Sequence, residues 1–304
     1  MSTTQKATMA PAFHPLQGVR ILSLALNLPG PAALMRCRQM GANCIKLEPP
    51  GGDPMGLYNP AAYAQLHEGV KVKAAELKTQ AGQQVLQREL AKADVLLTSF
   101  RPSALEKLDL GWEKLHRLYP ALSQVAIVGS QGARAEEPGH DLTYLAENGL
   151  VPGLELPPTL YADMSGSLLA VEAVLAAVLR QQERYAGTGD ANPRGVLIEV
   201  ALAEAAAWLA LPRQWGLTQP GGAVGGAHAG YRVYACKDGR VAVAALEPHF
   251  AAALCAAAGA TASDIRAMFD PATHQAIATF LLTQTRKQLD ALALAKDIPL
   301  HTMA

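Results

Sequence analysis

Four acid–base side chains, His140, Asp141, Asp163 and Glu247, are the part of this sequence most suited to chemistry. Each lies where one predicted element ends and another begins, so its side chain can face a cleft. One imidazole and three carboxylates can remove a proton from a carbon acid and return one. Taken singly, each also has a structural explanation, because such residues are common at helix N-termini. The set therefore predicts proton transfer only if the groups meet.

The elements that must position these residues alternate between strand-like and helical patterns. The predicted strands are 19–26, 43–47, 93–100, 123–128 and 196–200. The predicted helices are 31–41, 80–92, one that starts at a capping-box pattern at 103–106, and one from Asp163 to about residue 184. Strands separated by helices require crossover connections. The pattern thus predicts an α/β fold with a Rossmann-like, doubly wound parallel sheet.

A glycine-rich stretch divides the sequence into unequal parts. Residues 1–14 are predicted to be a flexible tail, 15–220 a large Rossmann-like domain, and 221–230 a linker. A second, smaller α+β domain at 231–304 begins with a hairpin around Lys237-Asp238-Gly239 and continues as helices, without an obvious core of its own. Gly187 to Gly195 is predicted to be a loop.

Composition and charge exclude several classes of function. Lys and Arg together number 26, as do Asp and Glu, so the formal net charge is zero and no basic field for nucleic acid is expected. No G-x-G-x-x-G follows the first predicted strand, which disfavours an NAD-dependent oxidoreductase. No metal-ligand spacing occurs either. The four cysteines, at 37, 44, 236 and 255, are interpreted as buried free thiols in a reducing compartment.

No targeting segment or membrane span is predicted. The first fourteen residues lack a continuous apolar stretch, and the longest apolar stretch, 168–179, is interrupted by Glu172 and is too short to cross a bilayer. A cytoplasmic protein without a membrane partner is therefore expected.

Several strings along the chain, in order, resemble the family III CoA-transferases (CaiB/BaiF type). They are 15–22 (PLQGVRIL), 28–31 (LPGP), 40–48 (MGANCIKLE), 76–78 (ELK), 93–97 (ADVLL) and 100–108 (FRPSALEKL). Two further strings, 139–145 (GHDLTYL) and 245–250 (ALEPHF), are most similar to the α-methylacyl-CoA racemase branch, as is 28–31. The resemblance runs from about residue 15 to residue 301.

This resemblance implies a two-domain α/β fold assembled as an interlocked homodimer, with the active site between subunits. It implies that His140 and Asp163 exchange protons with the α-carbon of an acyl-CoA thioester from opposite faces. Glu247 is implied to support the His side of the pocket, and Asp141 could orient the imidazole. The positive end of the helix beginning near Asp163 is a suitable place for the enolate oxygen.

Coenzyme A is expected as part of the substrate, with no other cofactor and no metal. The resemblance points to Lys78, Phe100, Arg101 and Lys107 for CoA contacts, in which the cations meet phosphates and Phe100 packs near the adenine.

Two alternatives to the racemase remain open. A CoA-transferase would use Asp163 as a nucleophile on the acyl thioester, forming a mixed anhydride and then an aspartyl-CoA intermediate, and would not need His140. A non-catalytic CoA-binding relative would keep the fold without turnover. The His140–Asp141 pair favours proton transfer and therefore the racemase.

Two departures from the family pattern bear on these expectations. Pro49 and Pro50 stand where the family often has Arg, and Lys71 and Lys73 are the cations that could substitute for a basic string. At 297–304 the chain resembles the point where family members begin a long return segment to the first domain, and this segment is expected to be shortened here.

Overall fold

The computed structural model describes residues 13–187, 194–260 and 265–304. By its internal contacts the chain divides after Leu209 into two compact units. This division comes before the predicted linker at 221–230, which lies within the second unit. Part of the predicted loop from Gly187 to Gly195 lies outside the described residues.

A six-stranded parallel sheet forms the centre of the first unit in the part of the chain described. Its strands are β1 (Arg20–Ser23), β2 (Asn43–Glu48), β3 (Lys71–Ala74), β4 (Val95–Thr98), β5 (Ser123–Val128) and β6 (Leu197–Ala201). Their order is β3-β2-β1-β4-β5-β6, which is the Rossmann order. In register, Ile21 of β1 pairs with Cys44 on one side and Val95 on the other. The predicted doubly wound sheet is confirmed.

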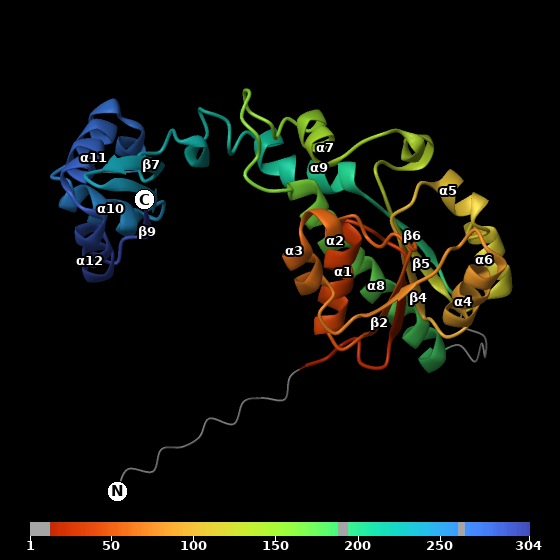
Figure 1. Ribbon diagram of the computed structural model, residues 1–304. Helices are drawn as coiled ribbons and strands as arrows, with labels where there is room; N and C mark the ends of the chain where they lie inside the picture. Colours follow the sequence, from red (N-terminus) through yellow and green to blue (C-terminus); the bar gives the residue numbers. More distant parts are fainter. Residues whose placement is uncertain (1–12, 188–193, 261–264) are drawn as a thin grey trace, which may run out of the picture. The chain divides into compact units, whose positions relative to one another are not determined.

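Helices cover both faces of this sheet (Figure 1). They are α1 (Pro29–Gln39), α2 (Met55–Tyr58), α3 (Pro60–Leu66), α4 (Gln80–Leu90), α5 (Pro102–Lys107), α6 (Trp112–Leu118), α7 (Asp141–Glu147), α8 (Tyr161–Gly187) and α9 (Leu202–Gln214), with a 3₁₀ turn η1 (Gly132–Glu136). The side chains of β1 alternate between two cores. Ile21 packs with α1, α7 and α8, whereas Leu22 packs with α4, α5 and α6. Burial on both faces is complete in the central strands β4 and β5, all of whose residues are buried.

Helix α8 is the longest helix described, and it packs against α1, β5 and β6. Among the described residues, its stretch Tyr161–Gln181 is long and apolar enough to cross a membrane, and half of that stretch is buried within the protein. Ala170, Val174 and Ala177 of this stretch are at most 1% exposed. The buried half of this stretch belongs to the core, whereas Leu168 and Leu179 are 59% and 57% exposed.

The predicted capping box at 103–106 is wrong. Helix α5 begins two residues earlier, with Arg101 in place of Ser103 as its N-cap and Pro102 in its first turn. The Ser103 backbone N–H and hydroxyl instead donate to the Glu136 carboxylate at 2.7 and 2.8 Å. Proline is favoured at the first helical position because its φ is preset, which explains the shift.

The second unit contains a small antiparallel sheet and its own core. Its elements are η2 (Ala223–Gly225), β7 (Tyr231–Cys236), β8 (Gly239–Ala244), α10 (Pro248–Ala257), η3 (Ile265–Phe269), α11 (Pro271–Thr283), α12 (Arg286–Lys296) and β9 (Leu300–Met303). The hairpin β7–β8 is confirmed, and β9 adds to it as a strand that was not predicted. Leu254, Ile277 and Leu281 are fully buried in a core of the unit's own, so the expectation of no obvious core is wrong.

All four cysteines are free and buried, as predicted. Burial raises the pKa of Cys37 and of Cys44 to about 12. These two thiols are therefore protonated at neutral pH, which makes them poor nucleophiles.

Gly30 permits a close approach between the first turn of α1 and the segment that follows β1. A Cβ on Gly30 would lie 2.1 Å from the Cβ of Ala25. We expect Gly30→Ala to destabilise the first unit by about 1 to 3 kcal/mol, because two buried segments must move apart. Urea unfolding measures this loss. Gly51→Ala is the matched control, because nothing lies within 4 Å of its Cβ position; an equal loss in both variants would contradict the steric argument.

Candidate active site

A cavity of about 870 Å³ lies at the carboxyl ends of β1, β4 and β5. The loops that follow these strands line it, with Asn27 after β1, Phe100 after β4 and Gly129 after β5. The chain turns to opposite sides of the sheet after β1 and β4, and ligands bind at such switch points in open α/β sheets. His140, Asp141 and Asp163 also line this cavity, so the structure brings together three of the four predicted acid–base residues.

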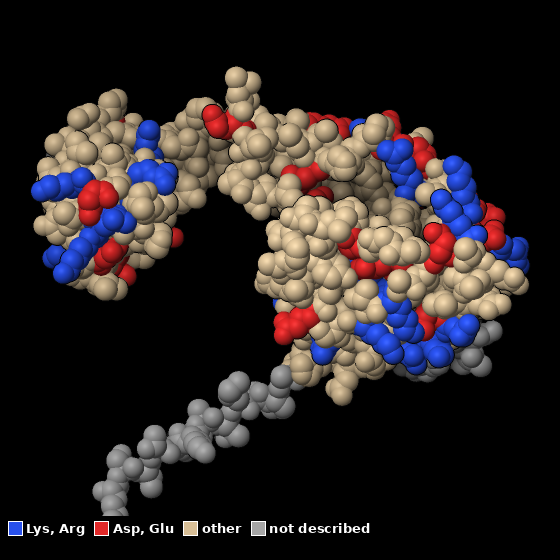
Figure 2. Space-filling model, in the orientation of Figure 1, with Lys and Arg blue, Asp and Glu red and all other residues tan. Residues whose placement is uncertain are grey.

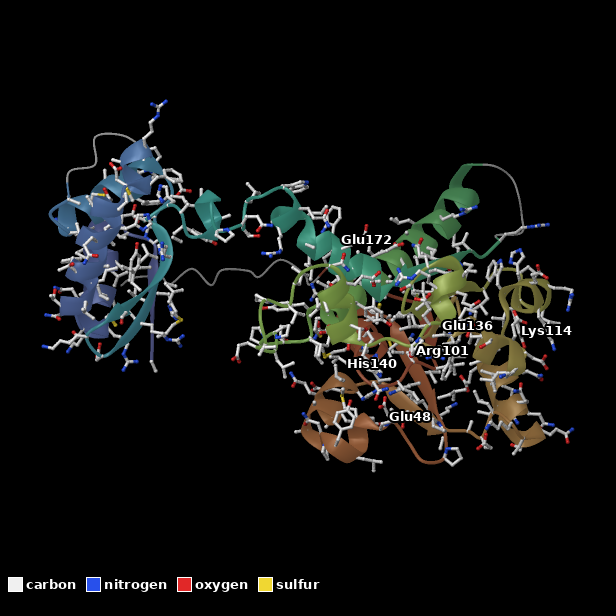
Figure 3. All side chains as sticks on the ribbon, turned by 90° about the horizontal axis from the view of Figure 1, so that it is seen from above. Glu48, Arg101, Lys114, Glu136, His140 and Glu172 are labelled. Atoms are coloured by element: carbon white, nitrogen blue, oxygen red, sulfur yellow. The ribbon has the colours of Figure 1, made fainter. Side chains whose placement is uncertain are left out.

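His140 is the N-cap of α7, and its imidazole is exposed toward the cavity. Its backbone N–H donates to the Thr143 hydroxyl at 3.0 Å, and that hydroxyl donates to the His140 carbonyl at 2.7 Å. These bonds fix the backbone that carries the ring. Figure 3 labels His140 together with Arg101, which lines the same cavity.

Asp141 and Asp163 connect the first turns of two helices. One carboxylate oxygen of the buried Asp141 accepts the backbone N–H of Asp163 at 3.0 Å. This bond satisfies one of the free N–H groups at the start of α8. The hydrogen bond of the Asp141 carboxylate runs to the Asp163 backbone, so the orientation of the His140 ring by Asp141 stays a prediction.

The carboxyl group of Asp163 is held in an environment that disfavours its charge. Burial, then the neighbouring Asp141 carboxylate, raise the pKa of Asp163 to about 6, while His140 acts in the opposite direction. A carboxylic acid with a pKa near neutrality can both accept and donate a proton at the pH of the cell. The site therefore holds an imidazole and a carboxyl group that are both suited to proton transfer.

Tyr144 shapes the wall of the cavity and was not singled out from the sequence. It is 7% exposed, and a Cβ on Gly129 or Gly139 would come within 2.3 or 2.5 Å of its hydroxyl. Burial, and to a lesser degree Asp163, raise the pKa of Tyr144. The signal for it was its spacing, because it follows Asp141 by about one helical turn and so shares its face of α7.

A buried ionic network supports the loop on the β1 side of the cavity. The Lys46 ammonium is fully buried and lies 2.5 Å from Asp53 Oδ2, 3.0 Å from Glu48 Oε1 and 2.8 Å from His67 Nε2. Burial and the Lys46 charge lower the pKa of His67, so its neutral ring accepts at Nε2 and donates from Nδ1 to the Tyr63 carbonyl at 2.7 Å. Glu48, Asp53 and His67 could together ligate a metal, but the ammonium bonds to all three.

Asp53 connects this network to a residue that lines the cavity. Both of its carboxylate oxygens accept the backbone N–H of Asn27 at 3.1 Å. Asn27 lines the cavity with a φ of 64°, a left-handed conformation that few residues other than glycine adopt. Sequence reasoning missed these roles; the available signal was a lysine inside a buried strand, at Lys46.

The predicted CoA-binding residues divide into two groups. Phe100 and Arg101 line the cavity. Lys78 and Lys107 are exposed and are not among the described residues that line it. The fourth predicted acid–base residue, Glu247, is the exposed N-cap of α10 in the second unit. Its support of the His side of the pocket stays a prediction.

Lys71 and Lys73, the two lysines expected to replace the family's basic residues, are not among the described residues that line the candidate active site. The Lys73 ammonium bonds to Glu89 at 2.5 Å, and Lys71 lines a different cavity at the amino ends of the strands.

Fold and cavity together define a Rossmann-like α/β protein with an acid–base site at its topological switch point. The sequence matches the family model "CoA-transferase family III" over residues 16–304. The chain therefore belongs to CoA-transferase family III, whose members include racemases and CoA-transferases.

Three relatives illustrate this range. The chain is 32% identical to mouse alpha-methylacyl-CoA racemase over 256 residues, which are 79% of this chain and 63% of the relative. It is 33% identical to succinyl-CoA–D-citramalate CoA-transferase of Chloroflexus aurantiacus over 198 residues, which are 60% of this chain and 49% of the relative. A probable fatty acyl-CoA transferase of Mycobacterium tuberculosis is 32% identical over 191 residues, 55% of this chain and 47% of the relative. The chain thus spans less than two thirds of the length of each.

A crystal structure of a hypothetical protein from Mycobacterium tuberculosis superposes with a TM-score of 0.81 at 24% identity, covering 96% of this chain and 86% of that one. A CAIB/BAIF family protein from Brucella suis gives 0.78 at 22% identity, covering 96% and 85%. At these identities the likeness concerns the fold.

Proposed function

We propose that this chain is an acyl-CoA racemase or epimerase that inverts the α-carbon of a 2-methylacyl-CoA-type thioester. The observation that carries this proposal is the pKa of about 6 of Asp163, in a cavity that His140 also lines. Inversion needs one base to remove the α-proton and one acid to return a proton to the other face. An imidazole and a carboxyl group whose pKa is raised toward neutrality are suited to exchange these roles in the two directions.

The proposed reaction is a two-base transfer through an enolate. One of the pair, His140 or Asp163, takes the α-proton, and the electron pair of the C–H bond moves into the thioester carbonyl. The other group then donates a proton to the opposite face of the carbon, and the carbonyl re-forms. Asp163 is in the first turn of α8, so the positive end of that helix supports negative charge on the enolate oxygen.

The CoA-transferase is the second candidate, because two of the relatives above are named as transferases. In that reaction Asp163 attacks the acyl thioester, CoA leaves, and a mixed anhydride forms. The attacking group must be ionised, and the environment of Asp163 disfavours its ionised form at moderately acid pH. A transferase would not need His140, which lines the same cavity, so the pair favours proton exchange over acyl transfer.

Deuterium exchange distinguishes these reactions. We expect a 2-methylacyl-CoA incubated with the protein in D₂O to gain deuterium at its α-carbon without an acceptor acid. His140→Ala should lower this rate by a factor on the order of 10² to 10⁴, since it removes one of two acid–base groups. His301→Ala, an exposed histidine of the second unit, is the matched control.

Two outcomes would contradict the racemase proposal. Transfer of CoA to an acceptor acid that persists in His140→Ala, without α-exchange, would identify a transferase. CoA binding with neither exchange nor transfer would identify a non-catalytic relative.

The assembly, location and ligand contacts belong to the same proposal. An interlocked homodimer, a cytoplasmic location, and CoA contacts from Lys78, Phe100, Arg101 and Lys107 stay predictions. Sedimentation of the purified protein tests the dimer, and CoA affinity of the four single variants tests the contacts.

A further inference from the structure

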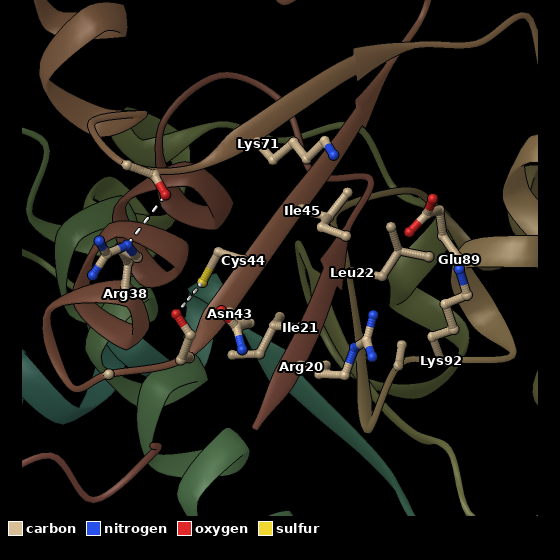
Figure 4. Close-up of a pocket in the computed structure, with 14 residues that line it drawn as sticks. Arg20, Ile21, Leu22, Arg38, Asn43, Cys44, Ile45, Lys71, Glu89 and Lys92 are labelled. Carbon is tan, nitrogen blue, oxygen red and sulfur yellow. Dashed lines mark hydrogen bonds between the residues drawn. The ribbon is translucent and has the colours of Figure 1, made fainter. Parts of the chain in front are cut away.

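A second cavity, of about 570 Å³, lies at the end of the large sheet opposite the candidate active site. Figure 4 shows the residues that line it. The cavity is lined where β1, β2 and β3 begin, by Arg20, Asn43 and Lys71. None of its lining residues lines the candidate active site. Because all strands of the sheet run in parallel, their amino ends meet here and their carboxyl ends meet at the first cavity.

Cations from separate elements surround this second cavity. Arg20 comes from β1, Lys71 from β3 and Lys92 from the turn after α4, and all three are exposed. In Figure 4 they surround Leu22 and Ile45, which line the cavity as apolar side chains. Arg38 lines the cavity on the far side of β2, where its Nε donates to the Gly69 carbonyl at 3.1 Å.

These positive charges exceed the negative charge among the lining residues. The Glu89 carboxylate interacts electrostatically with Lys71 and Lys92, but it offsets only part of the charge of the surrounding cations. The one carboxylate among the lining residues described is Glu89, and it is bonded to the Lys73 ammonium outside the lining. Within the described part of the chain, no ion pair involves Arg20, Lys71 or Lys92. Figure 2 shows Lys and Arg side chains gathered near α4 on the large unit.

The lining of this cavity thus carries an excess of positive charge, although the formal net charge of the whole chain is zero. A concave surface lined by one sign of charge concentrates its electric field and attracts ions of the opposite sign. Like charges held together also repel, so a bound anion would relieve that repulsion. Both effects favour an anionic ligand.

We propose that this cavity is a second ligand site, which binds a small molecule carrying two or more phosphate groups. The Arg20 guanidinium offers a planar pair of donors for phosphate oxygens, and Lys71 and Lys92 add ammonium charges around it. Ile45, which is partly exposed, provides an apolar surface for the organic part of the ligand. A volume of about 570 Å³ lies within the range of pockets that hold molecules of that size.

Calorimetric titration of the full chain with inorganic tripolyphosphate tests this site. We expect saturable binding at low ionic strength, tighter than that of inorganic phosphate. The double variant Arg20→Gln/Lys71→Gln should bind at least tenfold more weakly. Its matched control is Arg117→Gln/Lys287→Gln, which removes an exposed arginine and an exposed lysine elsewhere. Thermal melting of both variants verifies that they remain folded.

The outcomes separate this site from the alternatives. Equal weakening in the control would mean that binding follows net charge alone, and it would overturn the proposal. Tripolyphosphate binding that Arg20→Gln/Lys71→Gln leaves unchanged would place the anion elsewhere on the chain, and it would also overturn the proposal. Binding of a single-stranded oligonucleotide that needs Arg20 and Lys71, without binding of tripolyphosphate, would identify a nucleic-acid surface instead. Because Asp163 and His140 take no part, none of these results depends on the proposed racemase.

Discussion

Replacing Asp163 by Asn should abolish activity and make the folded chain more stable at neutral pH. Loss of the acid–base group should lower α-proton exchange by about a thousandfold or more, because an amide neither accepts nor donates the proton. The same change removes a carboxylate that the fold holds in an unfavourable, partly buried place beside Asp141. Activity and stability therefore change in opposite directions.

The pH dependence of this gain follows from the raised pKa. The folded chain binds a proton at Asp163 with a pKa of about 6, above the ordinary 3.8, so ionisation costs stability as the pH rises between these values. Asn removes that cost. The gain should be about 1 to 3 kcal/mol above pH 6.5 and should vanish below about pH 4, where the carboxyl group is protonated in both states.

Thermal melting of both chains between pH 4 and pH 8 measures this difference. Glu113→Gln, which replaces an exposed carboxylate in the first turn of α6, is the control and should show no such pH-dependent gain. An Asp163→Asn chain that is fully active would refute the assignment of the active site. A chain that is inactive but no more stable at pH 7.5 would show that the fold does not disfavour the ionised carboxylate of Asp163.

Replacing Lys46 by Met should destabilise the first unit by about 3 to 5 kcal/mol, because it leaves two buried carboxylates without their cation. The side chains of Lys46 and Asp53 are fully buried and that of Glu48 is 7% exposed, so water cannot substitute for the ammonium. Asp53 also holds the Asn27 backbone at the cavity, so α-proton exchange should fall as well.

Urea unfolding of three variants tests this network. Lys73→Met breaks the more exposed pair with Glu89 and should cost at most about 1 kcal/mol. The triple variant Lys46→Met/Glu48→Gln/Asp53→Asn should recover at least half of the loss, because its buried groups are neutral. If the triple variant is as unstable as Lys46→Met alone, packing rather than unpaired charge determines the effect.

The sequence predicted the central strands of the large sheet well because they are buried on both faces. The run 123–128 was predicted with the bounds that the structure shows for β5, and its six residues are all buried. Strand β3 was not predicted, because its residues Lys71–Ala74 lie at the sheet edge and are mostly exposed. Helix α8 begins at Tyr161, two residues before the predicted start at Asp163. β9 is short and half-polar, and only its pairing with β8 reveals it.

Residue types identified the candidate site, but its internal contacts depend on distant parts of the chain. His140, Asp141 and Asp163 were predicted together, and all three line one cavity. The bond from Asp163 to Asp141 could not be read from the sequence, because it joins two helices across a long loop. The Lys46 network was missed for a similar reason: a lysine in a strand is normally expected to be exposed, and its partners lie on separate segments.

The bond between the Asp141 carboxylate and the Asp163 backbone has a consequence for engineering. The segment 148–160 that joins α7 to α8 carries the exposed Leu154 and Leu156 and reaches the cavity at Leu160. Because this bond fixes the start of α8 against α7, the connecting segment need not hold the reacting groups in place. Segments from relatives could therefore be grafted at 152–160 while Asp163 keeps its place beside Asp141.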